Sequence, residues 1–367
     1  MTLEHYLHKL ISFPTVTGDA GAASELFEWI KNELQTVPLY VREYEHGGLP
    51  SLVITPTRRK HARVWLAAHI DVVSAPQELF HARRDGAKLI GRGAIDMKFA
   101  VACYLQLLKE IGVSMRDYDL GVMLTADEEW GTPGSVKYLL EEEGYTGDVA
   151  FLPDGSGWWK FEESAKGIWG LEVSTTGVAA HGSRPWLGRS AIVELMGFLT
   201  EVQAQAMQLL EHDDPDHWYT TLNVGLLEGG AAFNMVAPGA RATIDVRYIR
   251  ESDRRTLERL FLRVLKKYPN TVYTVTHSER PYGIRRGNTY AAAFARIAEE
   301  QCGIPCGWVR AHGASDARFF NAANIPTLLI GPRGGASHAD DEWVDILDLM
   351  RYYGVLRSFV HEVARKR

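Results

Sequence analysis

The chain has few cysteines, no excess of basic residues and no long apolar run. Its 367 residues include only Cys103, Cys302 and Cys306, too few and too scattered for a disulfide framework. The net charge of −6, without a Lys/Arg-rich block, offers nothing that attracts nucleic acid or an anionic membrane. No segment has the length of a membrane span, and the first residues lack a signal-peptide core. We therefore expect a cytoplasmic protein with small polar ligands and without nucleic-acid or membrane partners.

The first part of the chain alternates strand-like and helix-like segments. Strands are expected at 64–68, 120–124 and 149–152, and helices at 97–111 and 135–143. Such alternation predicts a doubly wound α/β sheet. Because 367 residues exceed what one core usually serves, and 46% of them are apolar, two packed domains are expected.

The middle of the chain has a different order of elements. A strand at 168–175, a helix at 190–210, strands at 221–227 and 241–248, a helix at 253–267 and a strand at 271–276 give β-α-β-β-α-β. This order is the ferredoxin-like plan. A helix at 289–301 and a strand at 327–330 then resume the first pattern. We predict a phosphorylase/hydrolase-like, doubly wound α/β domain at 1–166 and 278–367, with a ferredoxin-like α+β lid inserted at 167–277.

Acids and histidines follow the expected strands. One strand leads to His69 and Asp71, the next leads to Glu128 and Glu129, and the third leads to Asp154. Open α/β sheets bind ligands beyond the carboxyl ends of their strands. Two more residues of this type, Asp96 and His338, stand in glycine-rich segments. Carboxylates and imidazoles without thiolates suit zinc, cobalt or manganese, so the sequence predicts a hydrolase with two divalent metal ions.

Each of these residues also has an ordinary structural interpretation. A single histidine at a strand end, such as His69, more often forms hydrogen bonds than ligates a metal. In the metal interpretation, Asp71 would hold the far ring nitrogen of that histidine. The pair Glu128-Glu129 could be a solvated turn, and Asp154 could be a turn aspartate.

The order of these residues identifies a resemblance that runs nearly end to end, from Leu10–Val16 through Gly91–Gly93 to His338. The chain resembles the co-catalytic di-zinc peptidases, which include aminoacylase, acetylornithine deacetylase, succinyl-diaminopimelate desuccinylase and carnosinase-like dipeptidases. The resemblance implies that Asp96 bridges two ions and is followed by a cis peptide to Met97. It further implies that one ion is held by His69 and Asp154, and the other by Glu129 and His338.

The resemblance also implies the reaction and the residues around it. An amide bond would be cleaved by a water between the two metals, with Glu128 as the general base. In the lid, His181 would stabilise the oxyanion, although it could be a plain loop histidine. The residues Asn234 and Arg247 would bind a substrate carboxylate, but Arg247 could instead pair with Asp245. Relatives commonly dimerise through the lid, which makes the helix at 190–210 a candidate surface.

Two further residues, Ser315 and Asp316, occupy positions that line the cleft in the family, and either could cap a helix at 317–321. The surrounding Gly313–Ala317 also resembles a nucleophile elbow, but the second glycine of that motif is absent, which argues against a serine hydrolase. A catalytically inactive binding protein of the same fold is another alternative. It should lack a ligand or the base, and none is missing here.

The substrate is less closely defined. Among relatives, aspartate at the position of Asp154 is common in aminopeptidases and dipeptidases, and glutamate in carboxypeptidases and deacylases. We therefore predict a dipeptidase- or aminopeptidase-like enzyme for small peptides. The alternative is an N-acyl-amino-acid deacylase, which the modest chain length favours, or a carboxypeptidase of the same family.

Overall fold

The computed structural model describes residues 2–131, 134–155, 157–210 and 213–366. The chain forms two compact units. The first unit consists of Met1–Ser164, Gly283–Ala311 and Ser315–Arg367, and the second consists of Ala165–Tyr282 and His312–Ala314. Within the described residues, no helix combines the length and the apolar character that crossing a membrane requires.

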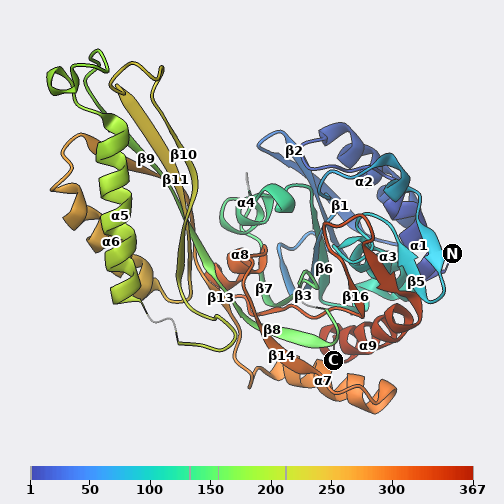
Figure 1. The fold of residues 1–367 in the computed structure, drawn as a ribbon. Helices are drawn as coiled ribbons and strands as arrows, with labels where there is room; N and C mark the ends of the chain where they lie inside the picture. Colours follow the sequence, from blue (N-terminus) through green and yellow to red (C-terminus); the bar gives the residue numbers. More distant parts are fainter. Residues whose placement is uncertain (1, 132–133, 156, 211–212, 367) are drawn as a thin grey trace. The chain divides into compact units, whose positions relative to one another are not determined.

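The first unit is built on a six-stranded sheet with the order β1-β2-β6-β3-β7-β15 (Figure 1). The strands are β1 (Tyr40–His46), β2 (Leu49–Thr55), β3 (His61–His69), β6 (Leu120–Thr125), β7 (Thr146–Phe151) and β15 (Thr327–Leu328). Strands β6, β3, β7 and β15 are parallel to one another, which confirms the predicted mixed α/β class. The antiparallel edge formed by β1 and β2 is not predicted by the pattern, because the charged β1 lacks the apolar run of the inner strands.

Helices cover this sheet and bury its central strand. Helices α3 (Lys98–Ile111) and α9 (Ile346–Ala364) pack against β3, and α2 (Ala20–Leu34) packs against β2. The run 64–68 in β3 is accordingly buried throughout, as expected for a strand covered on both faces. The other helices are α1 (Leu3–Ile11), α4 (Ser135–Glu141), α7 (Thr289–Cys302) and α8 (Ala317–Ala322).

Two smaller sheets accompany the main one. The first has the order β16-β17-β5-β4, with β16 (Gly334–Gly335), β17 (Trp343–Asp345), β5 (Lys88–Ile90) and β4 (Arg83–Asp85). The second has the order β13-β8-β14, with β13 (Tyr282–Gly283), β8 (Lys160–Ala165) and β14 (Gly307–Ala311). The β16-β17 pair matters for the site, because the loop between these strands contains His338.

The second unit is an antiparallel sheet of order β10-β11-β9-β12. Its elements run β9 (Gly167–Thr176), α5 (Ala191–Leu209), β10 (Thr221–Gly229), β11 (Gly239–Tyr248), α6 (Glu251–Leu265) and β12 (Thr271–Glu279). Figure 1 shows α5 and α6 on the same side of the sheet, where alternate strand residues such as Trp169, Leu171 and Val173 form a core with them. The opposite face of the sheet carries the other set of alternating side chains, among them Arg247.

Candidate metal centre

The candidate ligands of the first unit gather beyond the carboxyl ends of its parallel strands. The last residue of β3 is His69, while Glu129 follows β6 and Asp154 follows β7. Because the carboxyl ends of parallel strands meet at one edge, these side chains converge there. The loop before α3 adds Asp96, and the loop after β16 adds His338.

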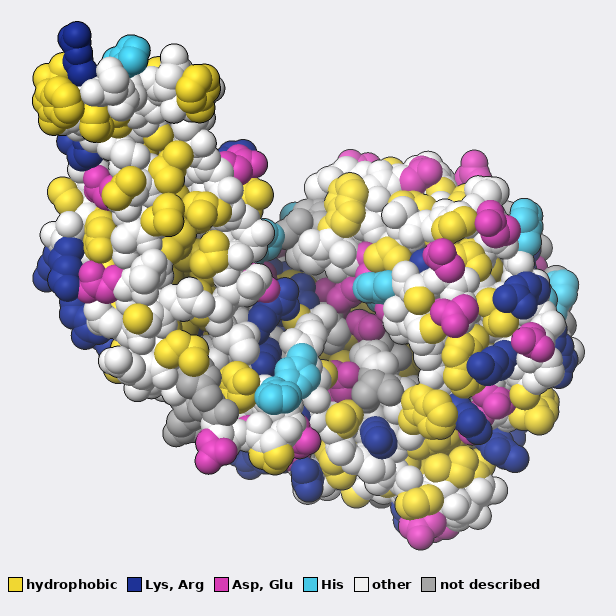
Figure 2. Space-filling model, in the orientation of Figure 1, with side chains coloured by type: hydrophobic (Ala, Val, Ile, Leu, Met, Phe, Trp, Pro, Cys, Tyr) yellow, Lys and Arg dark blue, Asp and Glu magenta, His cyan; other side chains and the backbone are white. Residues whose placement is uncertain are grey.

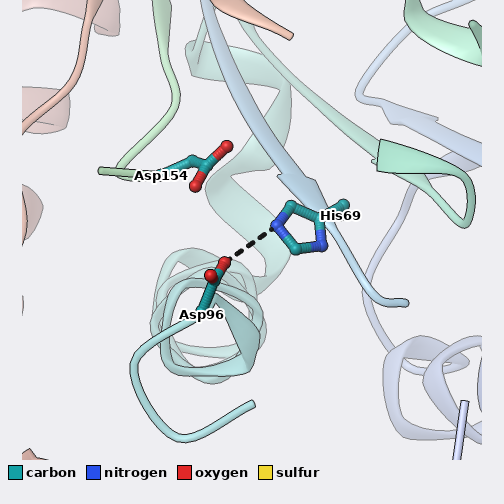
Figure 3. A group of neighbouring side chains, drawn as sticks. All are labelled: His69, Asp96 and Asp154. Atoms are coloured by element: carbon teal, nitrogen blue, oxygen red, sulfur yellow. Dashed lines mark hydrogen bonds and ion pairs between the residues drawn. The ribbon is translucent and has the colours of Figure 1, made fainter. Parts of the chain in front are cut away.

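The first ligand group consists of His69, Asp96 and Asp154, whose ligand atoms all lie within 4.8 Å of one another. Figure 3 shows both carboxyl groups directed toward the imidazole, with the His69 Nε2 atom 3.2 Å from Asp96 Oδ1. The other ring nitrogen, Nδ1, lies 3.0 Å from the backbone carbonyl of Asp71. A carbonyl can only accept, so Nδ1 carries a proton, and in the neutral ring this leaves the Nε2 lone pair for a metal ion.

The second ligand group consists of Asp96, Glu129 and His338. The Nε2 atom of His338 lies 3.2 Å from Asp96 Oδ2 and 3.0 Å from Glu129 Oε2. The two oxygens of Asp96 therefore face different groups, Oδ1 toward His69 and Oδ2 toward His338. This is the arrangement in which one carboxylate can be shared by two cations.

The charges of the two groups fit divalent cations. Burial raises the pKa of Asp154 to about 7, and repulsion from Asp96 adds to the effect. Burial likewise raises the pKa of Glu129 to about 7. Crowded carboxylates of this kind need nearby positive charge to remain ionised. A metal ion in each group would supply it, and nitrogen and oxygen donors without thiolates suit zinc, cobalt or manganese.

The position of Asp96 depends on a buried ion pair between Arg92 and Glu342. The two side chains are 2% and 0% exposed and lie 2.7 Å apart. The Glu342 carboxylate also accepts hydrogen bonds from the backbone N–H groups of Gly93, Ile95 and Asp96, at 3.0 to 3.1 Å. The arginine in turn donates to the backbone carbonyl of His338 at 3.1 Å. One ion pair therefore holds the backbone of two candidate ligands, including Asp96, whose peptide bond to Met97 is cis as expected.

Substituting Glu342→Gln is expected to lower the free energy of unfolding by roughly 3–5 kcal/mol, because it leaves the Arg92 charge buried without its partner. Urea denaturation followed by circular dichroism measures the change. The matched control is Glu228→Gln, which breaks the exposed ion pair with Arg241 and should cost less than about 1 kcal/mol. Equal losses in the two variants would contradict the role given to the buried pair.

Two consecutive tryptophans follow the Asp154 loop, and the first of them contacts the strand that leads to His338. Both Trp158 and Trp159 have left-handed backbones, with φ of 55° and 58°, which bulky residues rarely adopt. The Trp158 indole N–H donates to the backbone carbonyl of Gly334 at 2.7 Å. The loop that follows β7 is thus bonded directly to strand β16, which leads to His338.

The carboxylate of Asp71 lies beside the site but holds the backbone more closely than the histidine ring. Its Oδ1 atom is 3.5 Å from His69 Nδ1, farther than the backbone carbonyl of the same residue. The carboxylate accepts hydrogen bonds from the N–H groups of Glu128 and Glu129, at 3.3 and 3.1 Å, and from the Thr17 hydroxyl at 2.8 Å. Asp71 thereby orients the turn that carries both glutamates.

The side chain of Glu128 belongs to neither ligand group. Burial raises its pKa well above the usual range, and repulsion from Asp154 adds to this, while Asp316 and Asp96 contribute less. It therefore lies close to the first group, in surroundings that favour its taking up a proton.

Three of the predicted site residues, His181, Asn234 and Arg247, belong to the second unit, whereas both ligand groups belong to the first. The exposed His181 pairs with the strand segment at Met235, and its Nδ1 accepts hydrogen bonds from the N–H and hydroxyl of Ser183, at 3.1 and 2.8 Å. The backbone carbonyl of Asn234 accepts from Gly182 at 2.7 Å.

The two remaining predicted residues, Ser315 and Asp316, are buried in the first unit ahead of α8. The Ser315 hydroxyl accepts from the N–H of Ala317 at 3.4 Å, whereas Asp316 occupies the cap position without a side-chain capping bond. Burial raises the pKa of Asp316 to about 7, against the opposing charge of Arg318. The proximity of this acid to Asp154 and Glu128 follows from their mutual effects.

Comparison with known proteins gives consistent similarities. Residues 65–362 match the family model described as Peptidase family M20/M25/M40. The chain is 29% identical to carboxypeptidase G2 of a Pseudomonas species, over 94% of its own length and 85% of the relative's. It is 22% identical to succinyl-diaminopimelate desuccinylase of Rickettsia akari, over 98% and 99% of the two chains. Its fold is similar to that of a tripeptidase from Staphylococcus aureus, with a TM-score of 0.78 at 21% identity and with 99% and 98% of the chains covered.

Proposed function

The chain belongs to peptidase family M20/M25/M40, and on this basis we propose that it cleaves the amide bond of small peptides with two divalent metal ions. The observation that carries the proposal is the placement of Asp96, with one carboxylate oxygen toward His69 and the other toward His338. Zinc is the proposed metal, with cobalt or manganese as alternatives. When bound, such ions polarise the scissile carbonyl and acidify water.

The residue proposed to move the proton is Glu128. It lies beside the first ligand group without belonging to either group, and its raised pKa gives its carboxylate an affinity for protons. A base of this kind takes the proton of the attacking water and returns it to the leaving amine. The proposal gives Asp71 a positioning role, since it holds the N–H groups of the Glu128-Glu129 turn.

The lid residues are proposed to act on the substrate. Because the Nδ1 atom of His181 accepts hydrogen bonds from Ser183, its Nε2 atom carries the proton and can donate to a developing oxyanion. The planar guanidinium of Arg247 suits a substrate carboxylate, and Asn234 lies in the segment that pairs with the His181 loop. Ser315 and Asp316 would line the substrate site from the first unit.

For the substrate, we propose small peptides with a free amino terminus, on the strength of the aspartate at position 154. The similarity to carboxypeptidase G2 favours a second candidate, an N-acyl-amino-acid deacylase or carboxypeptidase. A panel of dipeptides, tripeptides, amino-blocked peptides and N-acyl amino acids, tested with the zinc- and cobalt-loaded protein, separates the two. Cleavage that needs a free amine supports the first, cleavage of blocked substrates alone supports the second, and turnover that survives metal chelation contradicts both.

We also propose a homodimer through the second unit. The exposed side of α5 carries Val193, Met196 and Met207, which are 70%, 52% and 59% exposed, and their spacing places them on one stripe. Figure 2 shows apolar side chains gathered over this part of the surface. Strand β10 is an edge of the sheet and can pair with another strand. Sedimentation velocity should give a dimer, and Met196→Glu should give a monomer; a monomeric wild type would refute the proposal.

A further inference from the structure

A large aromatic side chain, Trp130, is exposed beside the candidate metal centre. It follows Glu128 and Glu129 as the last residue of a short 3-10 helix, Glu128–Trp130. The side chain is 61% exposed. Within the described part of the chain, its ring stacks on no other aromatic ring or cation, and its indole N–H donates no hydrogen bond. Most of its apolar surface therefore remains available to a ligand.

The ring of Trp130 rests by one edge on Gly18. A Cβ atom added at this glycine would overlap the Cη2 atom of the ring and lie 2.8 Å from Cζ2, closer than van der Waals contact allows. The missing side chain at position 18 thus makes room for the indole. The glycine has a φ of 94°, a conformation that other residues rarely adopt. The ring therefore has a defined place, with backbone beneath one edge and solvent around the rest.

The segment beneath the ring is bonded to the same carboxylate as the turn that carries the ring. The hydroxyl of Thr17, which precedes the glycine, donates to the carboxylate of Asp71 at 2.8 Å. That carboxylate also accepts hydrogen bonds from the N–H groups of Glu128 and Glu129, at 3.3 and 3.1 Å. The position of the Trp130 ring is therefore fixed relative to the proposed base and to one candidate ligand.

We propose that Trp130 is one wall of a subsite that accepts an aromatic or large aliphatic side chain of the substrate. Successive side chains of a 3-10 helix point about 120° apart, so the indole flanks the turn that bears both glutamates. An apolar side chain gains favourable contact by packing on such a ring. The residues to which the resemblance to the di-zinc peptidases gives a role do not include Trp130. The assignment rests on the proposed function, which places the reacting bond at the metal centre.

Ligand binding tests the subsite without turnover. The full-length zinc-loaded protein is titrated with L-phenylalanine hydroxamate and L-alanine hydroxamate, whose identical hydroxamate groups offer oxygen donors to zinc. Isothermal titration calorimetry should give tighter binding of the phenylalanine compound. Trp130→Ala should weaken that binding by about 5- to 50-fold and change the affinity for the alanine compound by less than about twofold. Trp130→Phe keeps an aromatic ring and should restore most of the preference.

The matched control is Tyr40→Ala, which removes an exposed aromatic ring from the same unit. Tyr40 pairs with Thr55 at the end of the sheet opposite to the ligands, so both affinities should stay unchanged. Thermal denaturation and zinc content confirm that each variant is folded and loaded.

Two results would overturn the subsite alone. The first is a preference for the phenylalanine compound that persists in Trp130→Ala, and the second is an equal loss of affinity for both compounds. Binding of L-lysine hydroxamate as tight as that of the phenylalanine compound, and equally dependent on Trp130, would overturn the apolar assignment. If neither the phenylalanine nor the alanine compound bound to the zinc-loaded wild type, the proposed metal chemistry would be wrong, and the subsite with it.

Discussion

Replacing Glu128 with glutamine is expected to lower kcat by about 10²- to 10⁴-fold, which corresponds to roughly 3–5 kcal/mol of transition-state stabilisation. Glutamine keeps the shape of the side chain but cannot take the proton of the attacking water. Because Glu128 belongs to neither ligand group, the variant should keep its metal. Steady-state kinetics with the best substrate of the panel measures the first effect, and elemental analysis after dialysis measures the second.

Each result has a distinct meaning. The control Glu142→Gln neutralises an exposed glutamate of the same unit and should leave kcat unchanged. If Glu128→Gln kept wild-type turnover, another group would be the base. If it lost turnover together with its metal, Glu128 would be a ligand, and the separation of base and ligand between adjacent glutamates would be wrong.

Replacing Asp96 with asparagine is expected to remove both metal ions and, with them, all measurable turnover. One Asp96 oxygen faces His69 and the other faces His338, so the neutral amide weakens two sites at once. The measurement is metal content per chain after dialysis against zinc-free buffer. His338→Ala should instead remove one ion, since His69, Asp96 and Asp154 would remain together.

The control for this series is Asp85→Asn, a change at an exposed aspartate in the same unit, which should keep the wild-type metal content. An Asp96→Asn variant that still holds one ion tightly would show that Asp96 serves a single site. In that case the proposal that the two ions share the Asp96 carboxylate would be wrong, although each ligand group could still bind an ion by itself.

Local pattern explains which parts of the fold can be predicted. Strands such as β3 and β6 are continuous apolar runs because both faces are covered, so their sequence alone identifies them. Strand β15 is shorter than predicted, Thr327–Leu328 rather than 327–330. The residues Leu329 and Ile330 are buried, but their burial does not come from strand pairing. Burial and pairing have the same sequence signature here, and only the three-dimensional arrangement separates them.

The candidate metal centre likewise has residues that the sequence predicts and residues that it does not. The candidate ligands are recognisable because each follows a strand or a glycine-rich turn, where a chemically active side chain stands out. The residues that hold these ligands in place cannot be recognised in this way. The carboxylate of Glu342 accepts a hydrogen bond from the N–H of Asp96, which is 246 residues away in the sequence. The residues around Glu342 contain no motif that predicts this contact.

The five candidate ligands and the proposed base all belong to one unit, whereas Asn234 and Arg247, which are proposed to bind a substrate carboxylate, belong to the other. Metal binding and part of the substrate recognition are thereby encoded in separable parts of the chain. Substitutions around Asn234 and Arg247 can change which molecule is accepted without disturbing the candidate metal ligands. Such a division lets one reaction centre serve many substrates over evolutionary time. It also gives protein engineers a place to alter preference while leaving the chemistry intact.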